Sequence, residues 1–176
     1  FDSCNLGSIA VNRFLRADRK DFDWTRLAEA AKTCTHFLDN VIDMNNYPIP
    51  QIRETSNKTR RIGLGIMGFA DALYIMGIKY DAPEGLEKGE ELMKFIREES
   101  IKYSIKLAEK RGTFGAYKGS VWEKKGIKIR NSYLTTVAPT GTIGMIAECS
   151  GGLEPNFAIC FIKNVMDGTE LVYTNQ

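Results

Sequence analysis

Residues 139–144, Pro-Thr-Gly-Thr-Ile-Gly, combine residue types that suit the binding of an anion. They follow the β-branched and apolar residues 133–138, which predict a strand, and they lead into a short helix predicted at residues 143–147. Glycine and small hydroxyl side chains leave the backbone N–H groups of such a loop open to a phosphate. The loop lacks the lysine of a P-loop, so it does not indicate ATP hydrolysis. Taken alone, these residues fit an ordinary turn at the end of a strand equally well.

The four cysteines, at positions 4, 34, 149 and 160, are widely spaced and form no Cys-x-x-Cys pair. With His36 as the single histidine, this pattern predicts neither a metal site nor a disulfide framework, and it favours a reducing, cytoplasmic setting. Cys34 falls on the apolar stripe of a predicted helix, which indicates a core residue, whereas His36 points away from it as a solvated or edge-satisfied side chain. We expect Cys149 and Cys160 to be core or loop thiols. Cys4, taken alone, fits a small buried residue near a turn better than a redox thiol.

Gly63, Gly65 and Gly68 match the spacing Gly-x-Gly-x-x-Gly. A dinucleotide-binding loop would open a βαβ unit and be followed by an acidic residue at the end of a second strand. This motif leads instead into a short helical segment, residues 71–76, and then into a second long helix. We therefore interpret the three glycines as positions of close helix packing.

Two long helices are predicted to support these candidate sites. Asp23 is an N-cap for a helix over residues 24–44, and Pro83 begins an amphipathic helix that runs to about residue 110 and ends at Gly112. The polar residues 53–61 are expected to connect the first helix to the glycine motif.

Strands are predicted between and after the helices. Besides residues 133–138, two strand-like runs, residues 157–165 and 170–174, flank a turn at Asp167 and Gly168. Helices that alternate with strands, without repeats or low-complexity linkers, predict an α/β fold.

The composition of the 176 residues is that of an ordinary soluble protein, with 43% hydrophobic and 26% charged residues, enough for one core. Lys and Arg number 24, Asp and Glu number 22, and the basic residues are scattered, so the sequence predicts no binding to nucleic acid or to a membrane surface. The longest apolar runs, such as residues 62–70, are far shorter than the roughly 20 residues of a membrane span.

Four blocks of the sequence resemble, in their order and approximate spacing, segments of ribonucleotide reductase large subunits. They are residues 3–9 (SCNLGSI), 60–71 (RRIGLGIMGFAD), 135–143 (TTVAPTGTI) and 152–158 (GLEPNFA), and together they cover nearly the whole chain. Each block is moderately specific, and all four in register form a strong signal. The pattern looks most like the adenosylcobalamin-dependent, class II branch and its archaeal and bacterial relatives.

This resemblance implies a ten-stranded α/β barrel of two antiparallel half-barrels, as in ribonucleotide reductases and glycyl radical enzymes. Residues 1–176 would form a single partial domain, a segment of the second half-barrel. The implied reaction replaces the ribose 2′-hydroxyl of a ribonucleoside di- or triphosphate by hydrogen, which makes a deoxyribonucleotide. A thiyl radical abstracts the 3′-hydrogen, and a cysteine pair then supplies the electrons and becomes a disulfide.

The resemblance carries functional roles to five residues of this chain. Cys4 matches one member of the reducing cysteine pair, which favours redox work at this position. Thr140, Gly141, Thr142 and Ile143 match the loop that binds the substrate phosphates. We expect Asn5 and Gly7 of the first block only to shape the turn at Cys4.

The family pattern also contains parts that these residues lack. The finger loop with the radical cysteine, the redox partner of Cys4, the specificity effector site and most cobalamin contacts are expected before Cys4, and the re-reducing tail is expected after residue 176. The chain begins at Phe1 without an initiator methionine, so we expect a split subunit or an excised part of a longer protein, inactive without the radical cysteine. Gly144 replaces the serine usual in class II, which removes one hydroxyl contact expected for phosphate.

The implied partners are a ribonucleotide substrate, the remaining part of the catalytic subunit and a thioredoxin-type or dithiol reductant, in an oligomeric enzyme with adenosylcobalamin as cofactor. The sequence leaves open whether the radical starts from cobalamin or from a metal-bearing subunit, and whether diphosphates or triphosphates are used. Two alternative functions also stay open. One is a stand-alone nucleotide- or phosphate-binding module, and the other is a split subunit that only completes the barrel of its partner.

Overall fold

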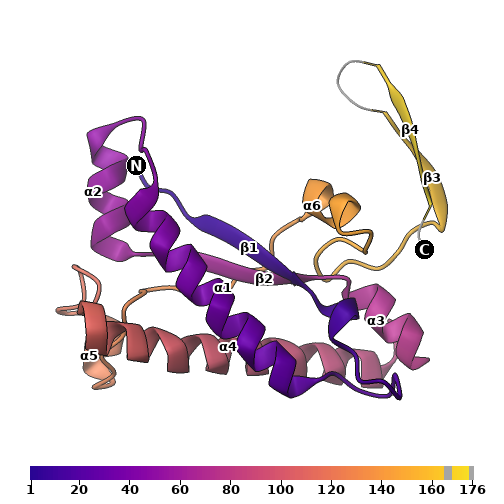
Figure 1. Cartoon of the computed structure of the whole chain (residues 1–176), viewed down its shortest axis with the longest axis horizontal. Helices are drawn as coiled ribbons and strands as arrows, with labels where there is room; N and C mark the ends of the chain where they lie inside the picture. The colour runs from indigo at the N-terminus through magenta and orange to yellow at the C-terminus, as the bar shows by residue number, and fades with distance from the viewer. Residues whose placement is uncertain (165–167, 175–176) are drawn as a thin grey trace.

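Two parallel strands, β1 (Asn5–Ala10) and β2 (Ile62–Met67), lie at the centre of the molecule (Figure 1). The structure is a computed structural model that describes residues 1–164 and 168–174. Helix α1 (Trp24–Met44) packs against both strands and against helix α4 (Pro83–Arg111). The remaining elements are η1 (Val11–Phe14), α2 (Pro50–Thr59), α3 (Phe69–Met76), α5 (Val121–Lys124), α6 (Gly141–Ile146), β3 (Cys160–Asn164) and β4 (Glu170–Thr174).

The strand predicted at residues 133–138 is reduced to a single bridge. Residues 133–136 extend along β2, where the N–H of Leu64 donates to the carbonyl of Leu134 at 2.8 Å and the N–H of Thr136 donates to the carbonyl of Leu64 at 3.0 Å. These bonds make a parallel bridge between Leu64 and Thr135. This isolated bridge places residues 133–136 beside β2, and the chain then continues to the loop at Thr140.

The interpretation of the three glycines as positions of close helix packing was wrong for Gly63 and Gly65, which lie in a strand, but it holds for Gly68, where α3 packs against Asn12 of η1. Gly63 and Gly65 belong to the buried strand β2, where an added Cβ would come within 2.8 Å of the Thr136 Cγ2 and within 2.7 Å of the Thr136 carbonyl oxygen, respectively. Their small size lets residues 133–136 approach β2. Gly68 has φ of +76° and begins α3, a conformation that favours glycine.

Both long helices have the predicted ends. Helix α1 begins after Asp23, whose side chain accepts a hydrogen bond from the N–H of Arg26 at 3.1 Å, and α4 ends at Gly112 with φ of +81°. The polar connection predicted at residues 53–61 was wrong, because residues 50–59 form helix α2. Only Ser56 of α2 is buried, so its sequence has no apolar stripe that would have indicated a helix.

A buried carboxylate joins four parts of the fold. Asp39 of α1 is fully buried, and its Oδ1 accepts hydrogen bonds from Arg60 Nε at 3.0 Å and from Asn131 Nδ2 at 2.9 Å. Its Oδ2 lies 3.2 Å from Arg111 Nη1 at the end of α4, and Arg60 also reaches Asp43 at 2.8 Å. A charged group can be buried at tolerable cost only when it is paired in this way.

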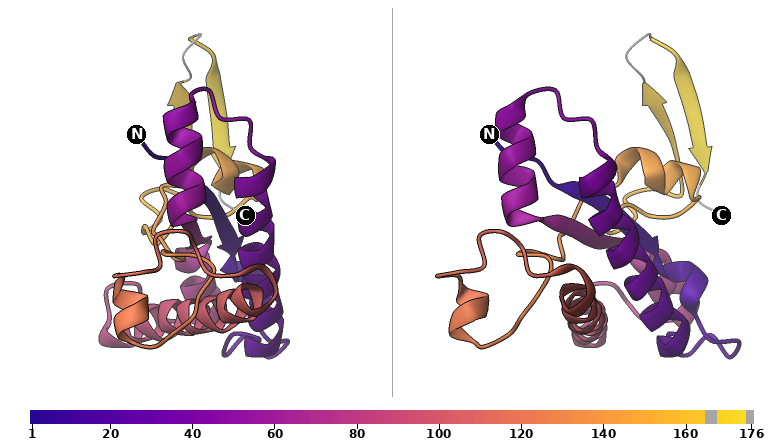
Figure 2. Two further views of the ribbon diagram at one scale, coloured as in Figure 1. Left: turned by 90° about the vertical axis from the view of Figure 1, so that its left-hand side faces the viewer. Right: turned by 60° about the vertical axis from the view of Figure 1, so that its left-hand side comes forward.

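The ten-stranded barrel expected from the resemblance is not confirmed. Within residues 1–164 and 168–174 no closed barrel forms, and β1 pairs only with β2. Strands β3 and β4 confirm the two strand-like runs predicted after residue 156, and they form an antiparallel hairpin that stands away from β1 and β2 (Figure 2). Val165 and the turn residue Asp167 lie outside the described residues.

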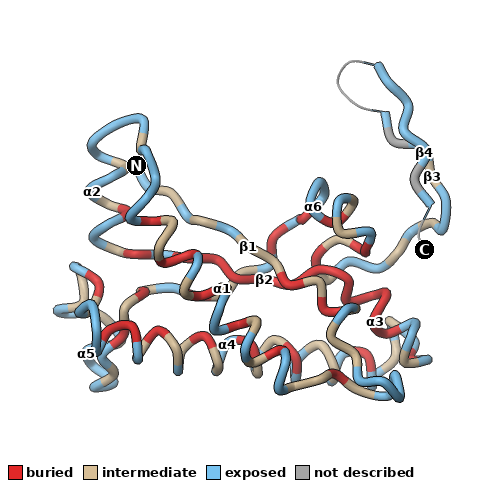
Figure 3. The backbone as a smooth tube through the Cα atoms, in the orientation of Figure 1, coloured by how far each residue is buried: buried red, intermediate tan, exposed pale blue. Residues whose placement is uncertain are grey.

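Burial differs between the central strands and the hairpin of β3 and β4. The most continuous buried stretch runs through β2 and the start of α3, whereas the hairpin is largely exposed (Figure 3). No helix among the described residues is long and apolar enough to cross a membrane. The described residues also contain no cluster of three or more His, Cys, Asp or Glu side chains that could hold a metal ion.

Replacing Arg60 by leucine should destabilise the fold strongly. The substitution leaves the Asp39 carboxylate buried without its closest cation, and loss of one partner from a buried pair costs about 3–5 kcal/mol. Urea titration of the chain measures this as a fall in the free energy of unfolding. Arg16→Leu is the control, because its ion pair with Asp18 is exposed and worth less than about 1 kcal/mol. Equal stabilities of the two variants would contradict the assigned role of Arg60.

The stability should also fall in acid through Asp43. A hydrogen bond from Arg60, helped by the charges of Arg60, Arg130 and Arg111, holds the pKa of Asp43 below its usual value although partial burial raises it. Since the folded pKa lies below the unfolded one, this stabilisation is present above about pH 4 and is lost as the pH falls through the folded pKa. Asp43→Asn should therefore make the unfolding free energy less steep between about pH 5 and pH 2. An unchanged slope in urea titrations at several pH values would show that Asp43 does not contribute.

Candidate functional site

The loop predicted to bind phosphate is shaped by Thr140. This residue has φ of +53° and is buried, and its hydroxyl accepts a hydrogen bond from the N–H of Gly152 at 2.7 Å. Its carbonyl accepts from the N–H of Gly144, also at 2.7 Å. The Thr140 hydroxyl is thus bonded to the segment at Gly152, so this side chain stabilises the shape of the loop.

Helix α6 begins directly after Thr140, two residues earlier than predicted. Gly141, Thr142 and Ile143 are exposed and form its first turn. The N–H groups of a first helical turn have no acceptor within the helix and carry partial positive charge. The structure therefore brings together three of the predicted substrate-binding residues with their backbone donors and the Thr142 hydroxyl available.

A second loop, residues 149–156, is fixed beside α6 by Asp71. The two carboxylate oxygens of Asp71 accept hydrogen bonds from the N–H of Ser150 at 2.6 Å and from Asn156 Nδ2 at 2.8 Å. The N–H of Gly68 donates to the Ser150 carbonyl at 2.7 Å. No role was predicted for Asp71. The only signal in the sequence was one acidic residue within the otherwise apolar segment 62–76.

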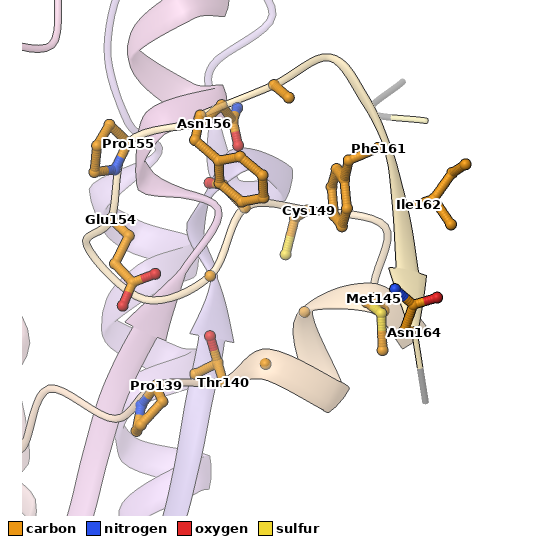
Figure 4. Close-up of a pocket in the computed structure, with 16 residues that line it drawn as sticks. Pro139, Thr140, Met145, Cys149, Glu154, Pro155, Asn156, Phe161, Ile162 and Asn164 are labelled. Carbon is orange, nitrogen blue, oxygen red and sulfur yellow. The ribbon is translucent and has the colours of Figure 1, made fainter. Parts of the chain in front are cut away.

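A pocket of about 490 Å³ lies between α6, this second loop and β3 (Figure 4). Gly141, Gly144 and Met145 line it from α6, whereas Thr142 and Ile143 do not. Among the described residues that line the pocket there is no Lys, Arg or His, and Glu154 is the one charged side chain. Any phosphate at α6 would therefore be held by backbone N–H groups and hydroxyls on the open face of the helix.

Cys4 lies directly before β1, and its side chain is exposed. The turn expected around Cys4 is absent, because Asn5 and Gly7 belong to strand β1. The hydroxyl groups of Ser3 and Ser56 are 2.8 Å apart, and Asp2 forms an ion pair with Arg61, so this segment is tied to the end of α2. Desolvation by neighbouring groups raises the pKa of the Cys4 thiol, which keeps its hydrogen at neutral pH.

Cys4 and the phosphate loop are not brought together by this chain. Cys4 precedes the parallel sheet and Thr140 follows it, so they lie near opposite ends of the strands (Figure 1). At about 3.3 Å per residue, their separation along the strand direction is roughly 20 Å. Cys34 packs against the core and Cys149 is buried, as predicted, whereas Cys160 is exposed in strand β3, so the prediction of a core or loop thiol was wrong for Cys160.

His36 is satisfied at the edge of α1, which agrees with its prediction. Its Nδ1 lies 3.0 Å from the Tyr103 hydroxyl, and its Nε2 lies 3.2 Å from Arg111 Nη2. Both ring nitrogens are therefore engaged with residues of α4.

Comparison with known proteins extends over the whole chain. The family model described as the ribonucleotide reductase barrel domain matches residues 1–176. A vitamin B12-dependent ribonucleoside-diphosphate reductase of Thermoplasma acidophilum is 52% identical over 175 residues, which are 99% of this chain and 23% of that protein. A protein of the same name from Mycobacterium tuberculosis is 43% identical over 99% of this chain and 25% of its own length.

A more distant relative, the ribonucleoside-diphosphate reductase subunit alpha of Chlamydia pneumoniae, is 31% identical over 94% of this chain and 19% of its own length. The chain thus spans about a quarter or less of the curated relatives that it matches. The family match covers β1, the glycine-bearing strand β2 and the loop at α6 alike, and the chain belongs to the ribonucleotide reductase barrel-domain family.

Proposed function

We propose that this chain works as part of the catalytic subunit of a ribonucleotide reductase, where Cys4 is one of two cysteines that reduce the substrate. The observation that carries this proposal is the family match over residues 1–176 together with a free, exposed Cys4 at the start of β1. The raised pKa of Cys4 supports it, because a protonated thiol has a hydrogen to give.

The proposed reaction balances with a pair of thiols. The C2′–O bond of the ribonucleotide breaks, a C2′–H bond forms, and the hydroxyl leaves as water. Two thiols supply the two electrons and two hydrogens and close into a disulfide. Cys4 provides one sulfur, and a cysteine in the remaining part of the subunit provides the other. A thioredoxin-type or dithiol reductant then restores both thiols.

The loop at α6 is proposed to hold the substrate phosphates. Exposed N–H groups at Gly141, Thr142 and Ile143 and the Thr142 hydroxyl are donors of the kind that bind phosphate oxygens. The names of the relatives specify ribonucleoside diphosphates, and we propose the same substrates for this chain.

The face of the sheet between Cys4 and the loop at α6 carries mainly small residues. Gly7 faces α1, since an added Cβ would lie 3.6 Å from Leu38, so its strand neighbours Leu6 and Ser8 face away from that helix. Gly63 and Gly65 lie on the same face of the sheet, next to Leu6 and Ser8, and both are buried against Thr136.

We propose adenosylcobalamin as the cofactor of the assembled reductase, following the names of its relatives. The residues present do not fit this group. The pocket of about 490 Å³ suits a small ligand, and both ring nitrogens of His36 are engaged by Tyr103 and Arg111. Its contacts therefore belong to the remaining part of the subunit. We further propose that the enzyme is oligomeric and works in the cytoplasm, consistent with four free cysteines.

Cys4→Ser in the assembled reductase should bind nucleotide normally and form no deoxynucleotide, even with excess dithiol. Serine keeps the size of the side chain but can neither form the disulfide nor give up hydrogen as readily. The measurement is product formation by chromatography, alongside nucleotide affinity by calorimetry. Cys160→Ser is the control, because Cys160 is also exposed but lies on the hairpin. Turnover of the Cys4 variant at the rate of the unmodified enzyme would remove Cys4 from the reaction.

Thr142→Val in the assembled reductase should weaken substrate binding by about 1–3 kcal/mol, the usual loss for a hydrogen bond to a charged group. Calorimetric titration with a ribonucleoside diphosphate measures the effect. Thr33→Val, an exposed threonine in the middle of α1, should leave the affinity unchanged. Equal affinities of both variants would exclude the Thr142 hydroxyl from the phosphate site.

A further inference from the structure

Helix α6 separates two sites. Its exposed residues Thr142 and Ile143 face the side proposed for the substrate, whereas Gly141, Gly144 and Met145 line the pocket behind the helix. Neither Cys4 nor Thr142 lines this pocket. Among the proposed phosphate donors only Gly141 lines this cavity of about 490 Å³, a volume typical of sites for small molecules, so the proposed reduction leaves most of the cavity without a role.

The side-chain amide of Asn156, which lines the pocket, has a fixed orientation. Asp71 is buried, and because a carboxylate oxygen only accepts hydrogen bonds, the atom of Asn156 that faces it at 2.8 Å must be the amide Nδ2. The other carboxylate oxygen of Asp71 is bonded to the N–H of Ser150. The amide of Asn156 therefore cannot flip without losing this bond. Its carbonyl oxygen faces the pocket (Figure 4) and accepts no hydrogen bond from the described residues.

The rest of the pocket selects against anions and offers an aromatic wall. Glu154 contributes a carboxylate, and no described Lys, Arg or His lines the cavity, so a phosphate would enter without a counter-charge. Phe157 and Phe161 both line the pocket with their ring centroids 4.9 Å apart, and they offer an aromatic surface on which a planar ligand can pack. Asn156 then offers an acceptor beside this apolar surface.

We propose that the pocket behind α6 is a second ligand site, which takes an uncharged planar heterocycle with an N–H or amino donor, such as a nucleobase or nucleoside. The donor of the ligand bonds to Asn156 Oδ1, and its ring packs on Phe157 and Phe161. The order of affinities is the reverse of that at the substrate face: at this site a nucleoside binds more tightly than its phosphorylated form, because Glu154 repels phosphate.

The test is calorimetric titration of the reductase large subunit with adenosine and with adenosine monophosphate, each with and without a saturating ribonucleoside diphosphate. Adenosine should bind more tightly than the monophosphate, and the diphosphate should not displace it. Asn156→Ala should weaken adenosine binding about 2- to 10-fold, the value of one neutral hydrogen bond. Phe161→Ala should weaken it about 5-fold or more, because a base–aromatic stack is lost.

Asp71→Asn gives an independent test with little change in volume. An asparagine at this position can keep the bond to Ser150 through its oxygen and donate through its amide to Asn156 Oδ1, which turns the Asn156 amide over. The pocket then presents a donor, and adenosine binding should fall as much as in Asn156→Ala while thermal unfolding stays near that of the unmodified protein. Thr142→Val, on the other face of α6, should leave adenosine binding unchanged.

Three results would overturn the second site: no adenosine binding at millimolar concentration, displacement of adenosine by the diphosphate, or equal adenosine affinity in the Asn156 and Asp71 variants and the unmodified protein. None of these results bears on the proposed reduction, which Cys4→Ser tests separately. Loss of diphosphate binding on Thr142→Val with unchanged adenosine binding would support two sites on opposite faces of α6.

Discussion

The burial of the Asp39 carboxylate is the constraint on which the rest of this structure depends. A lone charge in the core would cost several kcal/mol, so the fold has to bring cations and donors to it. Three segments supply them: the end of α2 provides Arg60, the end of α4 provides Arg111, and the segment before residues 133–136 provides Asn131. One side chain of α1 thus fixes the relative positions of three segments that are distant in the sequence.

The site follows from this arrangement. Arg60 stands two residues before β2, so its pairing with Asp39 positions the strand that pairs with β1. The small residues Gly63 and Gly65 let residues 133–136 lie close against β2, and this brings the chain to Thr140 at the far end of the sheet. Asp71 then fixes the loop at residues 149–156 behind α6. Cys4 is held separately, at the start of β1, by contacts with the end of α2 and with Arg61.

Local signals in the sequence were sufficient for the long helices and for the outline of the loop. An N-cap at Asp23, a proline at position 83 and a glycine at 112 act within one helical turn of where they stand, so the limits of α1 and α4 could be predicted. Helix α2 was missed because it buries only Ser56 and therefore shows no period. Strand β1 was missed because its small residues give no clear alternation of apolar and polar positions.

The finer features of the site depend on long-range contacts, which a single sequence does not show. Thr140 was predicted to bind substrate, but its hydroxyl is bonded to Gly152, twelve residues away. Asp71 holds Asn156 across 85 positions of the chain, and although each lies in a block that matches the family, neither block indicates that the two residues are in contact. The role of the glycines in β2 likewise became clear only when residues 133–136 were seen to lie against them.

If Cys4 is one sulfur of the reducing pair, its thiol must be oxidised after one reaction cycle. The assembled reductase would be allowed a single turnover without external reductant, then alkylated and analysed by mass spectrometry. We expect Cys4 to form a disulfide with a cysteine outside residues 1–176, while Cys34, Cys149 and Cys160 remain free thiols. Formation of one equivalent of deoxynucleotide with Cys4 still alkylated as a free thiol would contradict it.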